Sequence, residues 1–167
     1  MAGKGTQGTR ARPAPSVRIA RMRSKGASRV VAARPLFDRP LDLPATRRYL
    51  SDSRNLFLLA TEGRAAVGFL RGTFLLQTHT SRPQFFLYEI GVAPSARRRG
   101  VARALVERMR ALARRAGCEE AFVLTSPTNR AAVALYRSTG GRTETAGDRM
   151  YVYPLRRRRP NPPGVRA

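Results

Sequence analysis

Apolar residues alternate with other residues in some stretches of the chain and recur every three to four positions in others. The alternating or continuous apolar stretches predict strands, which are "SVRIARM" (16–22), "NLFLLATE" (55–62), "AAVGFLRGTFLLQ" (65–77), "QFFLYEIGV" (84–92), "AFVLTS" (121–126) and "DRMYVYPL" (148–155). The second and third flank a turn at Gly63 and therefore predict an antiparallel hairpin.

The helical period appears in four other stretches. "GASRVVAARPLF" (26–37) predicts a helix that Pro35 disrupts, and "LPATRRYLSD" (43–52) predicts one with Pro44 in its first turn. After Pro94 the period lengthens, and apolar residues predict a helix that ends near Gly117. "TNRAAVALYRSTGG" (128–141) predicts a helix closed by Gly140. The order β-α-α-β-β-β-α-β-α-β indicates the α/β class, a mixed sheet with helices on its faces.

The 167 residues suit one domain. Residues 1–15 and 156–167 combine Gly, Pro and basic residues without periodicity, so we expect them to be disordered basic tails around a domain at 16–155.

Charge and cysteine content add little to the choice of function. The 33 Lys+Arg against 10 Asp+Glu give a formal charge of +23, which attracts polyanions of any kind. The single cysteine, Cys118, excludes an internal disulfide and fits a reducing, cytoplasmic location. No apolar run approaches the ~20 residues that span a bilayer, so we expect no membrane partner, and we expect no metal.

The stretch "PSARRRGVARALVERM" (94–109) joins arginines to a helix start. A helix N-terminus leaves N–H groups unpaired and carries partial positive charge, so it suits an anion. Gly100 and the small Ala102 let a phosphate approach the backbone. The spacing therefore predicts a pyrophosphate site, whereas an exposed arginine patch is the alternative in a chain so rich in Arg.

"YEIGVAPSARRRGVARALVERM" (88–109) resembles the acetyl-CoA-binding segment of the GNAT superfamily of N-acetyltransferases, V-x-P-x-x-[QR]-x-x-G-x-[GA] followed by a helix. "TNRAAVALYRSTGG" resembles the segment that follows in the family, N-x-x-A-x-x-L-Y-x-x-x-G. The resemblance implies a GNAT-like fold with splayed central strands, acetyl-CoA as cofactor, and an enzyme that acetylates an amine.

The resemblance also implies roles for individual residues. The backbones of Ile90 and Val92 would pair with pantetheine, and Asn129 would contact the same arm. The Val92 N–H would serve the oxyanion, and Tyr136 would protonate the leaving sulfur. The full set expected to bind acetyl-CoA is Ile90, Gly91, Val92, Arg97, Arg98, Arg99, Gly100, Val101, Ala102, Asn129 and Tyr136.

Glu89 is the first candidate for the catalytic base. It is the only acid within its predicted strand, and an acid among apolar neighbours needs a polar cleft or a partner. A structural ion pair with an arginine is the alternative. His79, the only histidine, lies in a predicted loop and is the second candidate.

Within the superfamily the chain is most similar to aminoglycoside 3-N-acetyltransferases, through "LFDRP" (36–40), "FLYEIGV" (86–92), "RRRG" (97–100) and "ALYRSTGG" (134–141). A small-molecule amine with several cationic groups would bind carboxylates, and the candidates are Asp38, Asp42, Glu89 and Asp148. Helix capping or pairing with Arg39 is the alternative for the first two. The positive net charge opposes long-range attraction of such a cation.

Two rival functions remain. Relatives that acetylate ribosomal protein N-termini usually carry a glutamate five residues before the motif Asn, where this chain has Leu124, so protein acetylation is the less favoured enzyme function. A non-catalytic nucleic-acid-binding protein would use Arg156 to Arg159 but leaves the Asn129 and Tyr136 spacing unexplained, so nucleic acid is not the expected partner. The sequence leaves the oligomeric state open, although homodimers are common in the superfamily.

Overall fold

The computed structural model describes residues 17–143, which form one mixed sheet with helices on both faces. The strands are β1 Arg18–Arg21, β2 Asn55–Glu62, β3 Ala65–Leu75, β4 Gln84–Val92 and β5 Ala121–Val123. The α-helices are α1 Ala27–Ala32, α2 Leu43–Ser51, α3 Val101–Arg115 and α4 Arg130–Ser138. The predicted last strand, 148–155, and both predicted tails lie outside the described residues.

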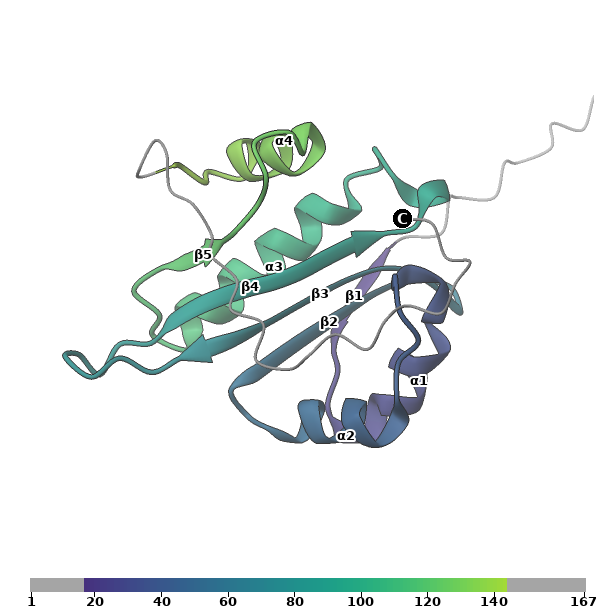
Figure 1. The fold of residues 1–167 in the computed structure, drawn as a ribbon. Helices are drawn as coiled ribbons and strands as arrows, with labels where there is room; N and C mark the ends of the chain where they lie inside the picture. Colours follow the sequence, from purple (N-terminus) through teal and green to yellow (C-terminus); the bar gives the residue numbers. More distant parts are fainter. Residues whose placement is uncertain (1–16, 144–167) are drawn as a thin grey trace, which may run out of the picture.

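The sheet order is β1-β2-β3-β4-β5, with antiparallel pairing from β1 to β4 and parallel pairing between β4 and β5. Helices α1 and α2 cover one face of the sheet, and α3 covers the other (Figure 1). The α/β class, the element order within the described residues and the hairpin at Gly63 are therefore confirmed.

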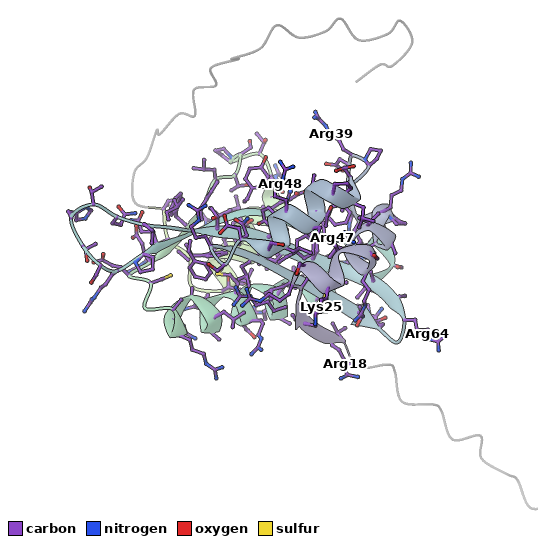
Figure 2. The ribbon with its side chains drawn as sticks, turned by 90° about the horizontal axis from the view of Figure 1, so that it is seen from below. Arg18, Lys25, Arg39, Arg47, Arg48 and Arg64 are labelled. Carbon is purple, nitrogen blue, oxygen red and sulfur yellow. The ribbon has the colours of Figure 1, made fainter. Side chains whose placement is uncertain are left out.

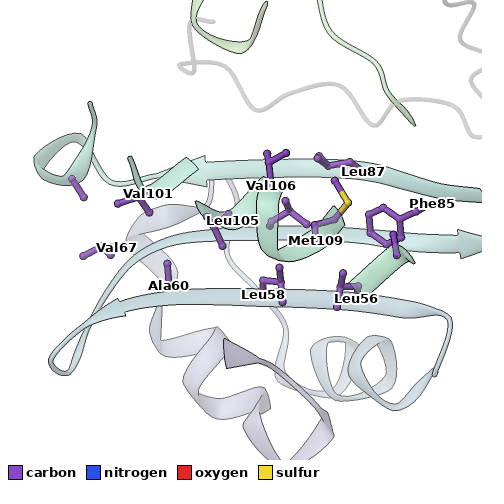
Figure 3. Close-up of a cluster of buried hydrophobic side chains, with 13 residues drawn as sticks. Leu56, Leu58, Ala60, Val67, Phe85, Leu87, Val101, Leu105, Val106 and Met109 are labelled. Atoms are coloured by element: carbon purple, nitrogen blue, oxygen red, sulfur yellow. The ribbon is translucent and has the colours of Figure 1, made fainter. Parts of the chain in front are cut away.

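Two apolar clusters hold these layers together. The first joins the sheet to α3 through side chains that are almost fully buried (Figure 3), among them Leu56, Leu58, Leu70, Phe85, Leu105 and Met109. The second joins the opposite face to α1 and α2, among them Met22, Val30, Leu50, Phe57 and Phe69. Adjacent strand residues such as Phe69 and Leu70 belong to different clusters, as the alternation of side chains along a strand requires.

The helix ends follow local sequence signals. Asp42 caps α2, because its Oδ1 accepts a hydrogen bond of 2.7 Å from the N–H of Ala45. Gly117 (φ 76°) follows α3 and Gly140 (φ 87°) follows α4, in the left-handed conformation that favours glycine. The N–H groups of these two glycines donate to the carbonyls three residues earlier, at 3.0 and 3.1 Å. Both predicted helix ends are thus confirmed.

Two elements are shorter than their sequence patterns. Strand β5 ends at Val123, whereas the pattern predicts a strand to residue 126, because β4 offers no further pairing beyond Leu87. Helix α1 ends at Ala32, and a 3-10 turn over Arg34–Leu36 contains the predicted disrupting proline, Pro35. No helix within residues 17–143 combines the length and the apolar character needed to cross a bilayer.

Gly72 leads to a prediction about stability, because the backbone of β3 lies against the Phe85 ring at this residue. A Cβ at Gly72 would lie 2.5 Å from Phe85 Cζ and closer still to the carbonyl oxygen of Phe86. We expect Gly72→Ala to lower the free energy of unfolding by ~3 kcal/mol or more, since the backbone of β4 must shift. Chemical denaturation measures the change.

The control is Gly63→Ala, where φ is 57° and an added Cβ meets nothing within 4 Å. It should cost only ~1 kcal/mol, the strain of the left-handed conformation. Equal losses in the two variants would contradict the clash at Gly72.

Candidate active site

An opening lies between β4 and β5. The ladder joins only Phe85–Leu87 of β4 to Ala121–Val123 of β5, and the chain then leads away to α4 (Figure 1). Within residues 17–143, the β4 backbone from Tyr88 to Val92 has no strand partner on that side. Unpaired strand backbone can pair with an extended ligand as if the ligand were another strand.

Ile90 and Val92 direct their backbone groups toward this opening. The N–H of Ala93 donates to the Val67 carbonyl of β3 at 3.0 Å, so the groups of the preceding residue point the other way. The Val92 carbonyl also accepts a bond of 3.3 Å from Arg97 Nε, which comes from outside the sheet. The two residues expected to pair with pantetheine therefore direct backbone groups toward the opening, where the Val92 carbonyl is already bonded to Arg97.

The turn that precedes α3 has the conformation of an anion site. Arg98 (φ 58°) and Gly100 (φ 81°) both adopt the left-handed conformation, and α3 begins at Val101. No side chain caps the helix, so its first N–H groups have no side-chain acceptor. A Cβ built on Gly100 meets nothing within 4 Å, so the space in front of the turn is open. The turn can admit a phosphate group to the backbone.

The three arginines of this turn differ in their contacts. Arg97 binds the Val92 carbonyl, and Arg99 forms an ion pair of 2.5 Å with Glu62 at the end of β2. Arg98 is exposed. The helix start and Arg98 are therefore the groups best able to meet an anion, while Arg97 and Arg99 also fix the turn to the sheet.

Glu89 lies on the α1/α2 face of the sheet and pairs with Arg71. Arg71 Nε and one terminal nitrogen each lie 2.6 Å from the same carboxylate oxygen, Oε2. The two side chains are 32% and 31% exposed, so the pair is only partly desolvated. The Arg71 guanidinium also lies 4.8 Å from the centre of the Tyr88 ring, a cation–π contact. The expected arginine partner of Glu89 is thus present, at a site that solvent reaches.

A β-bulge explains why neighbouring residues share that face. Arg71 pairs with Glu89 but Gly72 pairs with Leu87, so β4 has one extra residue, Tyr88. Leu87 and Ile90 both pack against the α3 cluster, although they are three positions apart. Tyr88 and Glu89 lie between them and therefore project to the opposite face. The Tyr88 side chain is 63% exposed there.

Helix α4 carries the two other motif residues. Asn129 caps the helix by accepting a bond of 3.1 Å from the Ala132 N–H, which leaves its amide NH₂ for another partner. Tyr136 packs against the α3 cluster and lines a cavity of about 370 Å³ with Leu87 and Met109. Burial raises the pKa of the Tyr136 phenol, so the group stays protonated at neutral pH.

Of the remaining candidates that the structure describes, none forms a hydrogen bond or an ion pair with Glu89 or Arg71. Asp42 caps α2, which is the alternative foreseen for it, and Asp38 is exposed in the segment before that helix. His79 is exposed beyond the hairpin end where Leu75 pairs with Gln84, with half of β4 between it and Glu89. Asp148 lies outside the described residues. The structure therefore brings neither Asp42 nor His79 to the ion pair.

Arg71, the ion-pair partner of Glu89, is the site residue that the sequence analysis did not identify. It is the one charged residue of β3, as Glu89 is of β4, and the hairpin register places the two opposite each other. Single charges in two adjacent apolar strands were the signal that could have identified the pair.

A comparison with protein-family models identifies the family of this chain. The model of the acetyltransferase (GNAT) family matches residues 20–140. The chain belongs to the GNAT family of acetyltransferases. This finding confirms the family resemblance of the two motifs and the GNAT fold, and it identifies an acetyltransferase of a family that uses acetyl-CoA.

Curated relatives and solved structures agree with the family. N-acetyltransferase 8 and N-acetyltransferase 8B of Rattus norvegicus are each 32% identical over 95 residues, 57% of this chain and 43% of theirs. The chain thus matches less than half the length of these relatives.

Solved structures cover more of the chain. An aminoglycoside acetyltransferase from an uncultured soil metagenomic sample, in complex with trehalose, has a TM-score of 0.77 at 22% identity, covering 84% of this chain and 97% of that one. Aminoglycoside N-acetyltransferase AAC(6')-Iy in complex with CoA has a TM-score of 0.69 at 24% identity, covering 84% and 95%. A ribosomal-protein-alanine N-acetyltransferase from Brucella melitensis biovar Abortus 2308 has a TM-score of 0.66 at 18% identity, covering 82% and 100%. These likenesses show the shared fold.

The open space at Gly100 generates a prediction about CoA binding. We expect Gly100→Glu to weaken acetyl-CoA binding at least ~10-fold, because it places a carboxylate where the helix start would meet a phosphate. Isothermal titration calorimetry measures the dissociation constant.

Gly117→Glu is the matched control, since Gly117 also has a positive φ (76°) and open space around its missing Cβ, at the other end of α3. It should suffer the same backbone strain and keep wild-type affinity. Unchanged affinity in a folded Gly100→Glu protein would refute the phosphate site.

Proposed function

We propose that this acetyltransferase transfers the acetyl group directly to a primary amine, with Glu89 as base and Tyr136 as acid. The observation that carries the proposal is the position of Glu89, on β4 beside the opening and with carboxylate oxygen Oε1 unbonded among the described residues. Tyr136 packs on the other face of the same strand, with Ile90 and Val92. A thioester bound in the opening between β4 and β5 would have the Glu89 carboxylate on one side and the Tyr136 hydroxyl on the other.

Acetyl-CoA fits the residues present. The unpaired backbone of Ile90 and Val92 would hold the pantetheine arm, and the free amide of Asn129 would contact it. The turn from Arg97 to Ala102 would hold the pyrophosphate, where the missing Cβ of Gly100 leaves room. When bound, acetyl-CoA supplies an acetyl thioester on which an amine forms a C–N bond as the C–S bond breaks.

Proton movements complete the reaction. An amine is mostly protonated at neutral pH, so its nitrogen must lose a proton before it can attack. Glu89 Oε1 accepts that proton, directly or through one water. Tyr136 holds a proton at its hydroxyl for the departing sulfur, and burial keeps it there by raising its pKa. The nitrogen loses its second proton as the amide forms, and that proton restores the phenol. The Val92 N–H donates to the oxygen that gains charge.

The first candidate acceptor is an aminoglycoside, at its 3-amino group. Structural neighbours that are themselves aminoglycoside acetyltransferases support the aminoglycoside class, and one of them is of the AAC(6') type. The choice of the 3-amino group rests on the motif resemblance alone. Ring-borne amines of this class are primary amines of the kind the mechanism needs. Among the described candidates, Glu89 Oε1 and the exposed Asp38 have carboxylate oxygens without a hydrogen bond, whereas Asp42 uses Oδ1 to cap α2.

We call the face of the sheet that carries Glu89, α1 and α2 the acceptor side. Its charge favours a second candidate acceptor, the amino group of a protein or peptide. Cations project outward from this side of the molecule (Figure 2), namely Arg18, Lys25, Arg39, Arg47, Arg48 and Arg64. They repel a small polycation at long range but leave a locally acidic peptide free to approach.

One assay separates these acceptors. Purified protein is mixed with acetyl-CoA and gentamicin, spermidine or peptides with free α-amino groups, and free thiol release is followed. Gentamicin turnover, with mass spectrometry of the acetylated position, supports the first candidate, and turnover of peptides alone supports the second. If no amine in the panel raises thiol release above the rate without amine, acceptor acetylation is contradicted. RNA binding without any turnover would favour the non-catalytic alternative.

The assignment of proton roles generates a prediction. Glu89→Gln should lower kcat by ~10²- to 10⁴-fold, the usual contribution of a positioned base, while acetyl-CoA affinity persists because pantetheine uses backbone groups. Glu107→Gln, an exposed glutamate on α3, is the control and should keep full activity.

Tyr136→Phe should behave differently from Glu89→Gln. Its loss should shrink for an acyl donor whose thiol is a better leaving group, because such a thiol needs less protonation. Full activity of Glu89→Gln together with inactive His79→Ala would move the base to the loop histidine.

A further inference from the structure

We propose that Arg71 is a positioning residue that holds Glu89 by one carboxylate oxygen and keeps the other oxygen for the acceptor amine. This inference rests on the proposed role of Glu89 as base. It adds a second strand, β3, to the catalytic machinery.

The two oxygens of the Glu89 carboxylate differ in their contacts. Both Arg71 nitrogens lie 2.6 Å from Oε2. No other described residue makes a hydrogen bond to Oε1. If the role of an arginine were only to link two strands, the bidentate arrangement would stabilise the pair most, because each nitrogen then donates to a different carboxylate oxygen. Here Oε2 accepts the hydrogen bond from Arg71 Nε and also lies 2.6 Å from the terminal nitrogen, and Oε1 remains an available proton acceptor.

Neighbouring groups fix the guanidinium. It lies over the Tyr88 ring, and the bulge that adds Tyr88 to β4 brings that ring to the same face as Glu89. The hydroxyl of Tyr49, from α2, donates to the Gly72 carbonyl at 2.9 Å, next to Arg71 in β3. Burial raises the pKa of Tyr49 to about 12, so this phenol is neutral and offers Arg71 no competing negative charge.

The position also suits an amine that arrives as a cation. Glu89 is about one-third exposed, so an acceptor can reach it without opening the core. A guanidinium donates hydrogen bonds and accepts none, so Arg71 can orient the carboxylate while Oε1 stays available to the proton of the acceptor. The guanidinium therefore orients the base without taking part in the proton transfer.

A double-mutant cycle tests the inference. Arg71→Gln, Glu89→Gln and the double variant are compared with wild type for kcat and for acetyl-CoA affinity, with gentamicin as acceptor, or spermidine if gentamicin is not acetylated. Arg71→Gln alone should lower kcat by ~10- to 10²-fold, because a base displaced by about an ångström loses that much. In the Glu89→Gln background the same change should cost less than about twofold, since Arg71 acts only through Glu89.

A second readout needs no turnover. In protein labelled with ¹³C at glutamate carboxyl carbons, the NMR signal absent from Glu89→Gln identifies Glu89. That signal should shift in Arg71→Gln and stay in place in Arg54→Gln. Arg54 is the matched control, because it also pairs with a carboxylate, Asp52, at 2.7 Å and does not contact Glu89. Arg71→Lys should recover part of the lost kcat, as one ammonium can still hold Oε2.

The outcomes separate this inference from the proposed function. If Glu89→Gln is inactive but Arg71→Gln keeps wild-type kcat, Arg71 is not a positioning residue and the base assignment stands. If the two losses simply add, Arg71 acts independently of Glu89, and the inference is overturned. If Glu89→Gln is fully active, the proposed base itself is wrong.

Discussion

The extra residue in β4 controls which side chains reach each face of the sheet at the site. Tyr88 is unpaired between the Arg71–Glu89 and Gly72–Leu87 pairs, and it reverses the alternation of side chains for the rest of the strand. If the side chains of β4 alternated regularly from Leu87 onward, with no bulge, Glu89 would project into the apolar cluster beneath α3, where an ionised carboxylate is costly. With it, Ile90 and Val92 remain on the α3 side.

The same constraint accounts for a glycine nearby. Beside the bulge, Gly72 passes so close to Phe85 that no side chain fits. The close approach brings β3 and β4 together where Arg71 must reach Glu89. The site thus depends on backbone irregularity at one point, while regular pairing holds the remainder of the hairpin in register.

Sequence patterns predict the elements because their causes are local. Alternation predicts β2, β3 and β4, and glycines predict the ends of α3 and α4, since only neighbouring residues decide these features. The bulge at Tyr88 is not predictable in this way, because it depends on packing across two strands. The partner of Glu89 was also hidden, since a chain with 33 basic residues offers many candidates.

Electrostatics sets a limit on how the acceptor can be bound. Asp42 is occupied by the α2 cap, Asp52 by Arg54, and Glu89 shares its charge with Arg71. A cationic acceptor therefore gains little from net attraction on this face and must be held by shape and by hydrogen bonds to particular atoms. Carboxylate Oε1 of Glu89 is such an atom, so recognition and deprotonation of the amine would take place at one oxygen. With Glu89 as the proposed base, an acceptor would therefore present its reactive nitrogen first, ahead of its other charges.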